Sequence, residues 1–176
     1  MIEAFARLIA PALEHAAAHG KPRLLLSAHG LPKRVIQRGD PYQAQVEATA
    51  AAVIARLARR GLDWLVCYQS RVGPLEWIGP YAEAEIDRAG RDRVPVVMAP
   101  IAFVSEHSET LVELDMLYRD RALATGAPAY VRVPALGTDR GFIGGLAALA
   151  RAAGGDIAGS GGGCHCPAGL AGCAMR

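Results

Sequence analysis

Aromatic side chains are scarce in this chain, since Phe, Trp and Tyr together make up 6% of its 176 residues. The hydrophobic content of 52% therefore rests on Ala, Leu and Val, which must build most of the core of a single domain. The chain also lacks a large excess of charge of one sign, because 19 basic and 17 acidic residues leave a net charge of +2. This excess is too small to argue for nucleic acid or an anionic membrane as a partner.

Long hydrophobic runs are missing as well. No apolar run reaches the roughly 18 residues that a transmembrane span needs. The first residues, 2–7, mix acidic and basic groups and do not resemble a secretory signal. We therefore expect a protein of the cytosol, attached to a membrane peripherally at most. Four cysteines in that reducing compartment indicate metal binding or core packing rather than disulfides.

Short apolar runs alternate along the chain with segments of helical spacing. The pattern predicts strands at 23–28, 64–68, 94–99 and 129–133, and helices at 2–19, 41–60, 80–89, 105–125 and 139–153. Pro11 is expected to interrupt the first helix, Asp40 to cap the second and Gly126 to end the fourth. This alternation predicts an α/β fold over residues 1–155, with a parallel sheet between two layers of helices. Residues 156–176 are expected to form a flexible glycine-rich tail with a cysteine cluster.

Polar residues follow the predicted strands, at the edge where parallel sheets bind ligands. His29 comes directly after the first strand and Ser70 follows the second. The His29 imidazole can take up a proton near neutral pH or bind ferrous iron. The plain alternative is a histidine whose nitrogens are satisfied by backbone groups of the turn.

The helix predicted at 105–125 has an acidic side. At about 100° per residue, its acids fall within a stripe about 60° wide. They are Glu106, Glu109, Glu113 and Asp120, and the apolar residues Leu111, Leu114, Tyr118 and Ala122 lie opposite. Any solvated surface helix has such faces, and acids in a first turn also suit the helix dipole. The position of the stripe, directly after a strand, favours a functional interpretation.

Three cysteines gather near the end of the chain, and they are Cys164, Cys166 and Cys173. Thiolates gathered in this way bind zinc or an iron–sulfur cluster, although an unligated tail is equally compatible with the pattern. The fourth ligand is open between His165, Cys67 and a cysteine of another chain. Cys67 lies in the middle of a predicted strand, where we expect it to be a buried packing residue.

Five motifs occur in an order that resembles the C-terminal half of the ferrochelatases. They are SAHGLP (27–32), GDPY (39–42), QSRVGPLEWIGP (69–80), PIAFVSEHSETLVELD (100–115) and RVPAL (132–136). Enzymes of that family insert ferrous iron into protoporphyrin in haem biosynthesis, with the porphyrin bound between two similar α/β domains. The resemblance implies that this chain corresponds to the second domain of such a lyase, with ferrous iron as a substrate.

The resemblance also implies roles for individual residues. His29 would lie against the pyrrole nitrogens as proton acceptor or metal ligand, and Glu109 would be its acidic partner on the other side of the macrocycle. The implied metal-binding residues are His29, Glu109, Glu106 and Glu113, and the implied porphyrin pocket is formed by Tyr42, Ser70, Trp77 and His107. Core packing is the commoner role of a lone tryptophan such as Trp77. Some relatives bind a [2Fe–2S] cluster through C-terminal cysteines, which Cys164, Cys166 and Cys173 resemble with a different spacing.

The chain has about half the length that such an enzyme should have, which leaves its partner open. The other wall of the site could come from an N-terminal half or from a second copy of the chain. A homodimeric chelatase for sirohydrochlorin or a cobalt precursor is the nearest rival function, and coproporphyrin is a rival substrate. A metal-binding or iron–sulfur module without catalytic activity is the alternative from another class.

Overall fold

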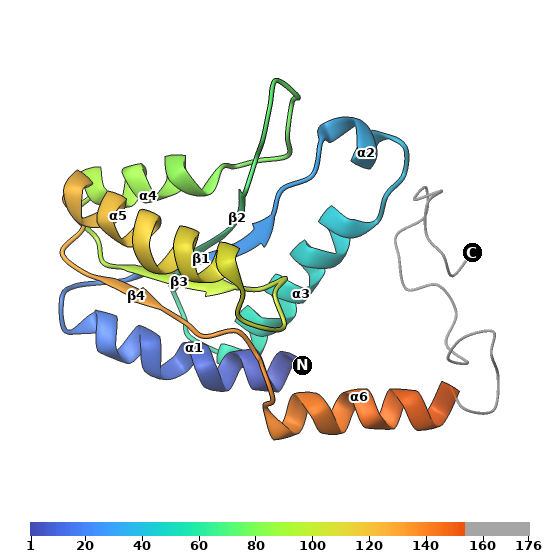
Figure 1. Cartoon of the computed structure of the whole chain (residues 1–176). Coiled ribbons are helices and arrows are strands. Elements are labelled where there is room, and N and C mark those ends of the chain that lie inside the picture. The colour runs from blue at the N-terminus through green and yellow to red at the C-terminus, as the bar shows by residue number, and fades with distance from the viewer. Residues whose placement is uncertain (154–176) are drawn as a thin grey trace.

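A parallel sheet of four strands lies in the middle of the protein (Figure 1). The computed structural model describes residues 1–153. The strands are β1 (Arg23–His29), β2 (Asp63–Gln69), β3 (Val96–Pro100) and β4 (Tyr130–Arg132). They lie in the order β2-β1-β3-β4, and each neighbouring pair is parallel. Their carboxyl ends therefore meet at one edge of the sheet.

Helices cover both faces of the sheet (Figure 1). They are α1 (Ile2–Ala17), α2 (Lys33–Gln37), α3 (Tyr42–Leu57), α4 (Ala82–Arg91), the π-helix η1 (Glu109–Tyr118), α5 (Arg119–Thr125) and α6 (Arg140–Ala153). Residues of α1 and α3 pack on one face, and residues of α4, η1 and α5 pack on the other. The predicted α/β fold is confirmed. No helix within residues 1–153 is long and apolar enough to cross a membrane.

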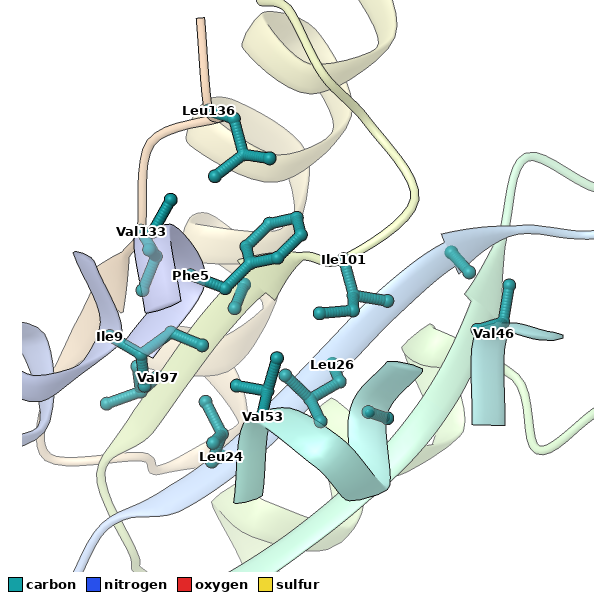
Figure 2. Packing of buried hydrophobic residues seen from close by; sticks show 14 of the residues in the cluster. Phe5, Ile9, Leu24, Leu26, Val46, Val53, Val97, Ile101, Val133 and Leu136 are labelled. Carbon is teal, nitrogen blue, oxygen red and sulfur yellow. The ribbon is translucent and has the colours of Figure 1, made fainter. Parts of the chain in front are cut away.

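Strand β1 contributes to the core on both faces because successive side chains of a strand point in opposite directions. Leu24 and Leu26 belong to the cluster with α1 and α3, where Figure 2 shows them near Val53. Leu25 belongs to the cluster on the other face. All three leucines are fully buried, and burial of each contributes about 1.5–3 kcal/mol. The strand that ends in His29 is therefore anchored from both sides.

The expected interruption of the first helix was wrong, because α1 continues through Pro11. Its apolar stripe of Phe5, Ile9 and Leu13 is buried against the sheet. Pro11 lies on the exposed side of the helix. Packing of the buried stripe offsets the backbone hydrogen bond that the proline cannot donate.

The segment between β1 and α3 differs from the expectation in two respects. The short helix α2 was not predicted, because five residues show no helical periodicity. Helix α3 begins at Tyr42 rather than at Pro41, and Oδ1 of Asp40 accepts a hydrogen bond of 2.8 Å from the backbone N–H of Tyr42. The N-cap residue of α3 is Pro41, without a side-chain cap hydrogen bond, so the expected cap at Asp40 was wrong; Asp40 instead contacts the first N–H of the helix from one residue further upstream.

The helix expected at 105–125 begins at Glu109, and its first ten residues form a π-helix that continues into α5. Glu106 precedes the helix and is not part of an acidic stripe on it. Leu111, expected on the same apolar side as Leu114 and Tyr118, is 46% exposed, whereas those two residues are buried. The expectation failed because i→i+5 hydrogen bonds widen each turn, so that the angle of an α-helix does not apply.

Candidate functional site

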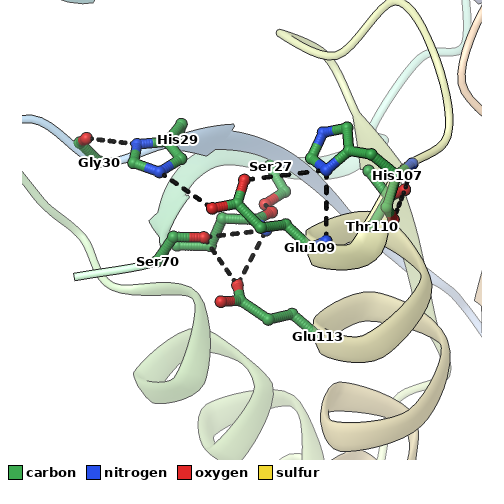
Figure 3. Close-up of polar contacts among 9 residues, drawn as sticks. Ser27, His29, Gly30, Ser70, His107, Glu109, Thr110 and Glu113 are labelled. Atoms are coloured by element: carbon green, nitrogen blue, oxygen red, sulfur yellow. Dashed lines mark hydrogen bonds and ion pairs between the residues drawn. The ribbon is translucent and has the colours of Figure 1, made fainter. Parts of the chain in front are cut away.

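The candidate site lies where η1 crosses the carboxyl edge of the sheet (Figure 3). His29 is the last residue of β1, Gln69 is the last residue of β2, and Ser70 follows it. Glu109 and Glu113 come from η1, one turn apart. The structure thus brings together residues that are 80 positions apart in the sequence, as the strand-end pattern predicted in outline.

The ring of His29 is oriented by the backbone of the next residue. Its Nδ1 lies 2.7 Å from the carbonyl oxygen of Gly30. A carbonyl oxygen can only accept, so Nδ1 carries the hydrogen, and in the neutral ring Nε2 holds the lone pair. Tyr42 supports the same turn, because its hydroxyl donates a hydrogen bond of 3.0 Å to the carbonyl oxygen of His29. Backbone groups therefore satisfy one nitrogen of His29 and leave the other available.

Glu109 lies between two imidazole rings (Figure 3). Its Oε1 is 3.5 Å from Nε2 of His29, and its Oε2 is 4.0 Å from Nδ1 of His107. His107 Nδ1 also accepts a hydrogen bond of 3.2 Å from the backbone N–H of Glu109, so its neutral tautomer carries the hydrogen on Nε2. The three side chains are each about 40% exposed. They form a group open to solvent that can hold or pass a proton.

The turn that carries His29 requires a glycine at position 30. A Cβ on Gly30 would lie 2.9 Å from the carbonyl oxygen of Gln69 and 3.3 Å from the ring of Trp77. Trp77 therefore packs under this turn, and its indole Nε1 is buried without a hydrogen-bond partner among residues 1–153. Its proposed contact with a porphyrin stays a prediction.

Glu113 is held by a polar network from the ends of β1 and β2 (Figure 3). Its Oε2 accepts hydrogen bonds from Nε2 of Gln69 at 3.0 Å and from Oγ of Ser70 at 2.8 Å. The Oε1 of Gln69 in turn accepts a hydrogen bond from the hydroxyl of Ser27. Gln69 and Ser27 were not among the expected site residues, although Gln69 stands at a strand end in one of the five motifs.

Glu106 pairs with Arg132, the last residue of β4. The guanidinium of Arg132 lies 2.6 Å from Oε1 of Glu106, and it also binds Asp115 through two nitrogens. The backbone N–H of Ala135 donates a further bond of 2.8 Å to Glu106. Burial alone would raise the pKa of Glu106, but the hydrogen bonds from Arg132 and Ala135 outweigh it and lower the pKa.

The four expected metal-binding residues do not converge in the structure. Glu106 is bound to Arg132, and Glu113 is bound to Gln69 and Ser70, which leaves His29 and Glu109 in contact. Within residues 1–153, no group of three or more His, Cys, Asp or Glu side chains could hold a metal ion. Arg132 was not among the expected site residues. It is the last residue of β4, so the strand-end pattern that led to His29 and Ser70 could also have indicated it.

The cysteine cluster of the tail lies outside the described residues. Cys67, which was considered as a fourth ligand, is fully buried on β2. Burial raises the pKa of its thiol well above the ordinary value. Its expected role as a buried packing residue is confirmed.

Known proteins resemble this chain over nearly all of the described fold. A family model described as Ferrochelatase matches residues 1–153. The chain is 58% identical over 151 residues to a ferrochelatase of Caulobacter vibrioides (strain NA1000 / CB15N), covering 86% of this chain and 43% of that protein. It is 53% identical over 150 residues to a ferrochelatase of Phenylobacterium zucineum, covering 85% and 43%. It is 50% identical over 170 residues to a ferrochelatase of Hyphomonas neptunium, covering 94% and 47%.

The matched region runs from α1 to α6 and contains the edge with His29, Glu109 and Glu113. The chain spans a little less than half the length of these three relatives. The family resemblance inferred from five short motifs is thereby confirmed. On this evidence the chain belongs to the ferrochelatase family.

Proposed function

We propose that this chain supplies the catalytic half of an enzyme that inserts ferrous iron into protoporphyrin in haem biosynthesis. The contact between His29 and Glu109 at the carboxyl edge of the sheet carries this proposal. Both side chains are 40% exposed, so that a large flat substrate can reach them. Membership of the ferrochelatase family supports the choice of reaction.

The reaction needs proton acceptors beside the ring. Insertion breaks two pyrrole N–H bonds, forms bonds from iron to the ring nitrogens and releases two protons. Nε2 of His29 presents a lone pair, and Glu109 presents a carboxylate. A side chain placed for such a transfer contributes about 10²–10⁴-fold to the rate. The pair can therefore take both protons without an organic or redox cofactor.

The distance between His29 and Glu109 also decides whether the two groups act on one face of the macrocycle or on opposite faces. Nε2 of His29 and Oε1 of Glu109 are 3.5 Å apart, which leaves no room for a flat ring between them. In this arrangement both groups act from one face, rather than from opposite sides as the resemblance implied. The other face then falls to a second α/β unit, either the remaining half of a longer protein or another copy of this chain.

Ferrous iron, as the incoming substrate, would meet the same two groups. Imidazole nitrogen and carboxylate oxygen are suitable ligands for it. Glu113 lies one turn of η1 further along and could receive protons from Glu109 or pass iron to it. Glu106 is bound to Arg132 and Ala135, so we assign it an anchoring role.

Porphyrin fluorescence under anaerobic conditions tests the proposal, because insertion of ferrous iron quenches it. The chain is assayed alone and together with the remaining part of the Caulobacter vibrioides relative. Quenching with the second part, and its loss in His29→Ala, would support a catalytic half. Quenching by the chain alone, together with a dimeric mass, would point to two copies. Absence of quenching in both assays, with the protein folded, would overturn the proposal.

We propose further that Cys164, Cys166 and Cys173 bind a [2Fe–2S] cluster. Cys67 is fully buried on β2, so we expect the fourth ligand to come from elsewhere. Anaerobic reconstitution with iron and sulfide should give visible absorption in the unsubstituted chain. The absorption should persist in Cys67→Ala and disappear in Cys166→Ser. Visible absorption that disappears in Cys67→Ala would contradict this assignment.

We also place the protein in the cytosol, with peripheral attachment to a membrane at most. The free thiol of Cys67 is compatible with a reducing compartment. Fractionation of cells that express the protein should recover it in the soluble fraction, or release it from membranes at high salt. Retention that only detergent can reverse would contradict this placement.

A further inference from the structure

Gln69 carries an amide that is completely shielded from solvent at the end of β2. Ser27 on β1, whose hydroxyl contacts this amide, is fully buried too. Polar groups in such a position cost free energy unless they are paired. Both are paired here, and their partners form a chain of hydrogen bonds that ends at Glu113 on η1 (Figure 3).

The partners determine which way the amide of Gln69 faces. The hydroxyl of Ser27 donates to Oε1 of Gln69. A carboxylate can only accept, so the group that faces Glu113 at 3.0 Å must be the NH2 of Gln69. The second hydrogen of that NH2 lies toward Oγ of Ser70, 3.4 Å away. Reversal of the amide would place two acceptor oxygens against each other at Glu113.

Ser70, the other residue that donates to Glu113, has an unusual backbone conformation. Its φ of 62° lies in the left-handed region, which costs a residue other than glycine of order 1–3 kcal/mol. The hydroxyl of Ser70 donates to the same oxygen, Oε2 of Glu113, at 2.8 Å. Oε1 of Glu113 accepts none of the hydrogen bonds that are described within residues 1–153. Two donors thus fix one oxygen of Glu113, and the other is left for a ligand or a proton.

We propose that Gln69 is a positioning residue for iron insertion, acting by holding Glu113 in a fixed orientation beneath Glu109. This inference rests on the proposed function. Gln69 cannot touch a porphyrin or an iron ion, because no part of its side chain is exposed. Its effect on the reaction must therefore pass through Glu113, whose carboxylate sets the direction of the amide, with the hydroxyl of Ser27 donating to the other end.

Gln69→Glu separates this role from a merely structural one. The substitution keeps the shape and keeps an oxygen for the hydroxyl of Ser27, but it places a second carboxyl group against Glu113. The two can be joined only by a shared proton. We expect insertion to slow by about 10- to 100-fold at neutral pH. We expect it to recover partly as the pH is lowered, with the KM for porphyrin unchanged within about twofold.

Two further variants complete the comparison. Gln69→Leu removes the donor without adding an acid, so its insertion rate should fall without the recovery at low pH. Gln43→Glu is the matched control, because Gln43 donates to Glu47 at 3.0 Å on the exposed side of α3. Its rate and pH profile should equal those of the unsubstituted protein. Equal rates and pH profiles for Gln69→Glu and Gln43→Glu would overturn the inference.

A spectroscopic measurement decides the network independently of activity. In 1H–15N spectra of the unsubstituted chain, the side-chain amide protons of Gln69 should exchange slowly with solvent and shift on Glu113→Ala. Those of Gln43 should exchange quickly and stay unchanged. Fast exchange at Gln69, or no response to Glu113→Ala, would show that the network does not exist, whether or not a variant folds. Absence of iron insertion in the unsubstituted protein, alone and with the second part, while the amide is protected, would instead overturn the proposed function and leave only the hydrogen-bond network in place.

Discussion

Nε2 of His29 lies 3.5 Å from Oε1 of Glu109, although the two residues come from a β-strand and a π-helix that are far apart in the sequence. Nδ1 of His29 is bound to the carbonyl oxygen of Gly30, so the free nitrogen of the ring is the one that faces the carboxylate. Two proton acceptors held together at an open edge can take protons from a bound substrate.

Loss of either member of this pair should abolish most of the activity. We expect His29→Ala and Glu109→Gln each to lower the insertion rate by about 10²–10⁴-fold, because each removes a proton acceptor. Anaerobic fluorescence quenching measures the rate. His15→Ala is the control, since His15 is exposed on α1, and its rate should be unchanged. A His29→Ala variant with more than a tenth of the normal rate would exclude His29 as the base.

The salt-bridge cluster around Arg132 should stabilise the edge that carries η1. Arg132→Lys keeps the charge but cannot bind Glu106 and Asp115 together, because the planar fork is lost. We expect the free energy of unfolding to fall by about 2 kcal/mol, measured by urea denaturation. Arg121→Lys is the matched control on an exposed Arg–Asp pair between α5 and α4, and it should cost less than about 1 kcal/mol. Equal losses in the two variants would contradict a special role for Arg132.

Glu106 should make stability depend on pH in the acid range. Its pKa is lowered in the folded protein, because the hydrogen bonds from Arg132 and Ala135 outweigh the effect of burial. The stabilisation is therefore fully present above the unfolded pKa of about 4.3 and is lost as the pH falls through the folded pKa. Urea denaturation across this range should show a smaller loss for Glu106→Gln than for the unsubstituted protein. A variant with the same pH dependence would assign the acid sensitivity to other groups.

Two glycine positions should respond oppositely to the same substitution. A Cβ on Gly90 would lie 2.3 Å from Oγ1 and 2.7 Å from the carbonyl oxygen of Thr125, where α4 meets α5. Gly90→Ala should therefore cost about 1–3 kcal/mol, because backbone has to shift. A Cβ on Gly144 in α6 would meet nothing within 4 Å, so Gly144→Ala should stabilise by about 0.5–1 kcal/mol. Thermal unfolding measures both, and a stable Gly90→Ala variant would rule out the close approach of α4 and α5.

The sequence patterns predicted the strand ends better than the helix that crosses them. The placement of His29 and Ser70 at one edge followed from alternation of strands and helices, because every parallel strand delivers its carboxyl end to the same side. The acidic stripe on one helix was wrong, because the structure has a π-helix where an α-helix was assumed. Glu106 consequently lies outside the helix and binds Arg132.

The network around Gln69 could not be predicted from the sequence. Gln69 and Glu113 are 44 positions apart, and neither spacing nor residue type indicates that one amide will meet one carboxylate. The positive φ of Ser70 could not be predicted from the sequence either. Glycine is the residue that usually adopts the left-handed backbone region, so a serine gives no signal for it. Such contacts depend on the register of strands and on the turn width of a helix.

The sequence by itself determined the fold class, the family and the edge of the sheet that carries the polar residues, because these follow from local periodicity and from short motifs. Only the tertiary structure decided which acid faces His29, which acid is anchored by Arg132 and how Glu113 is held. The physical reason is that side-chain direction on η1 depends on its hydrogen-bond pattern, which has no local sequence signal, and on the burial of Leu114 and Tyr118 in the cluster shared with the sheet and α4.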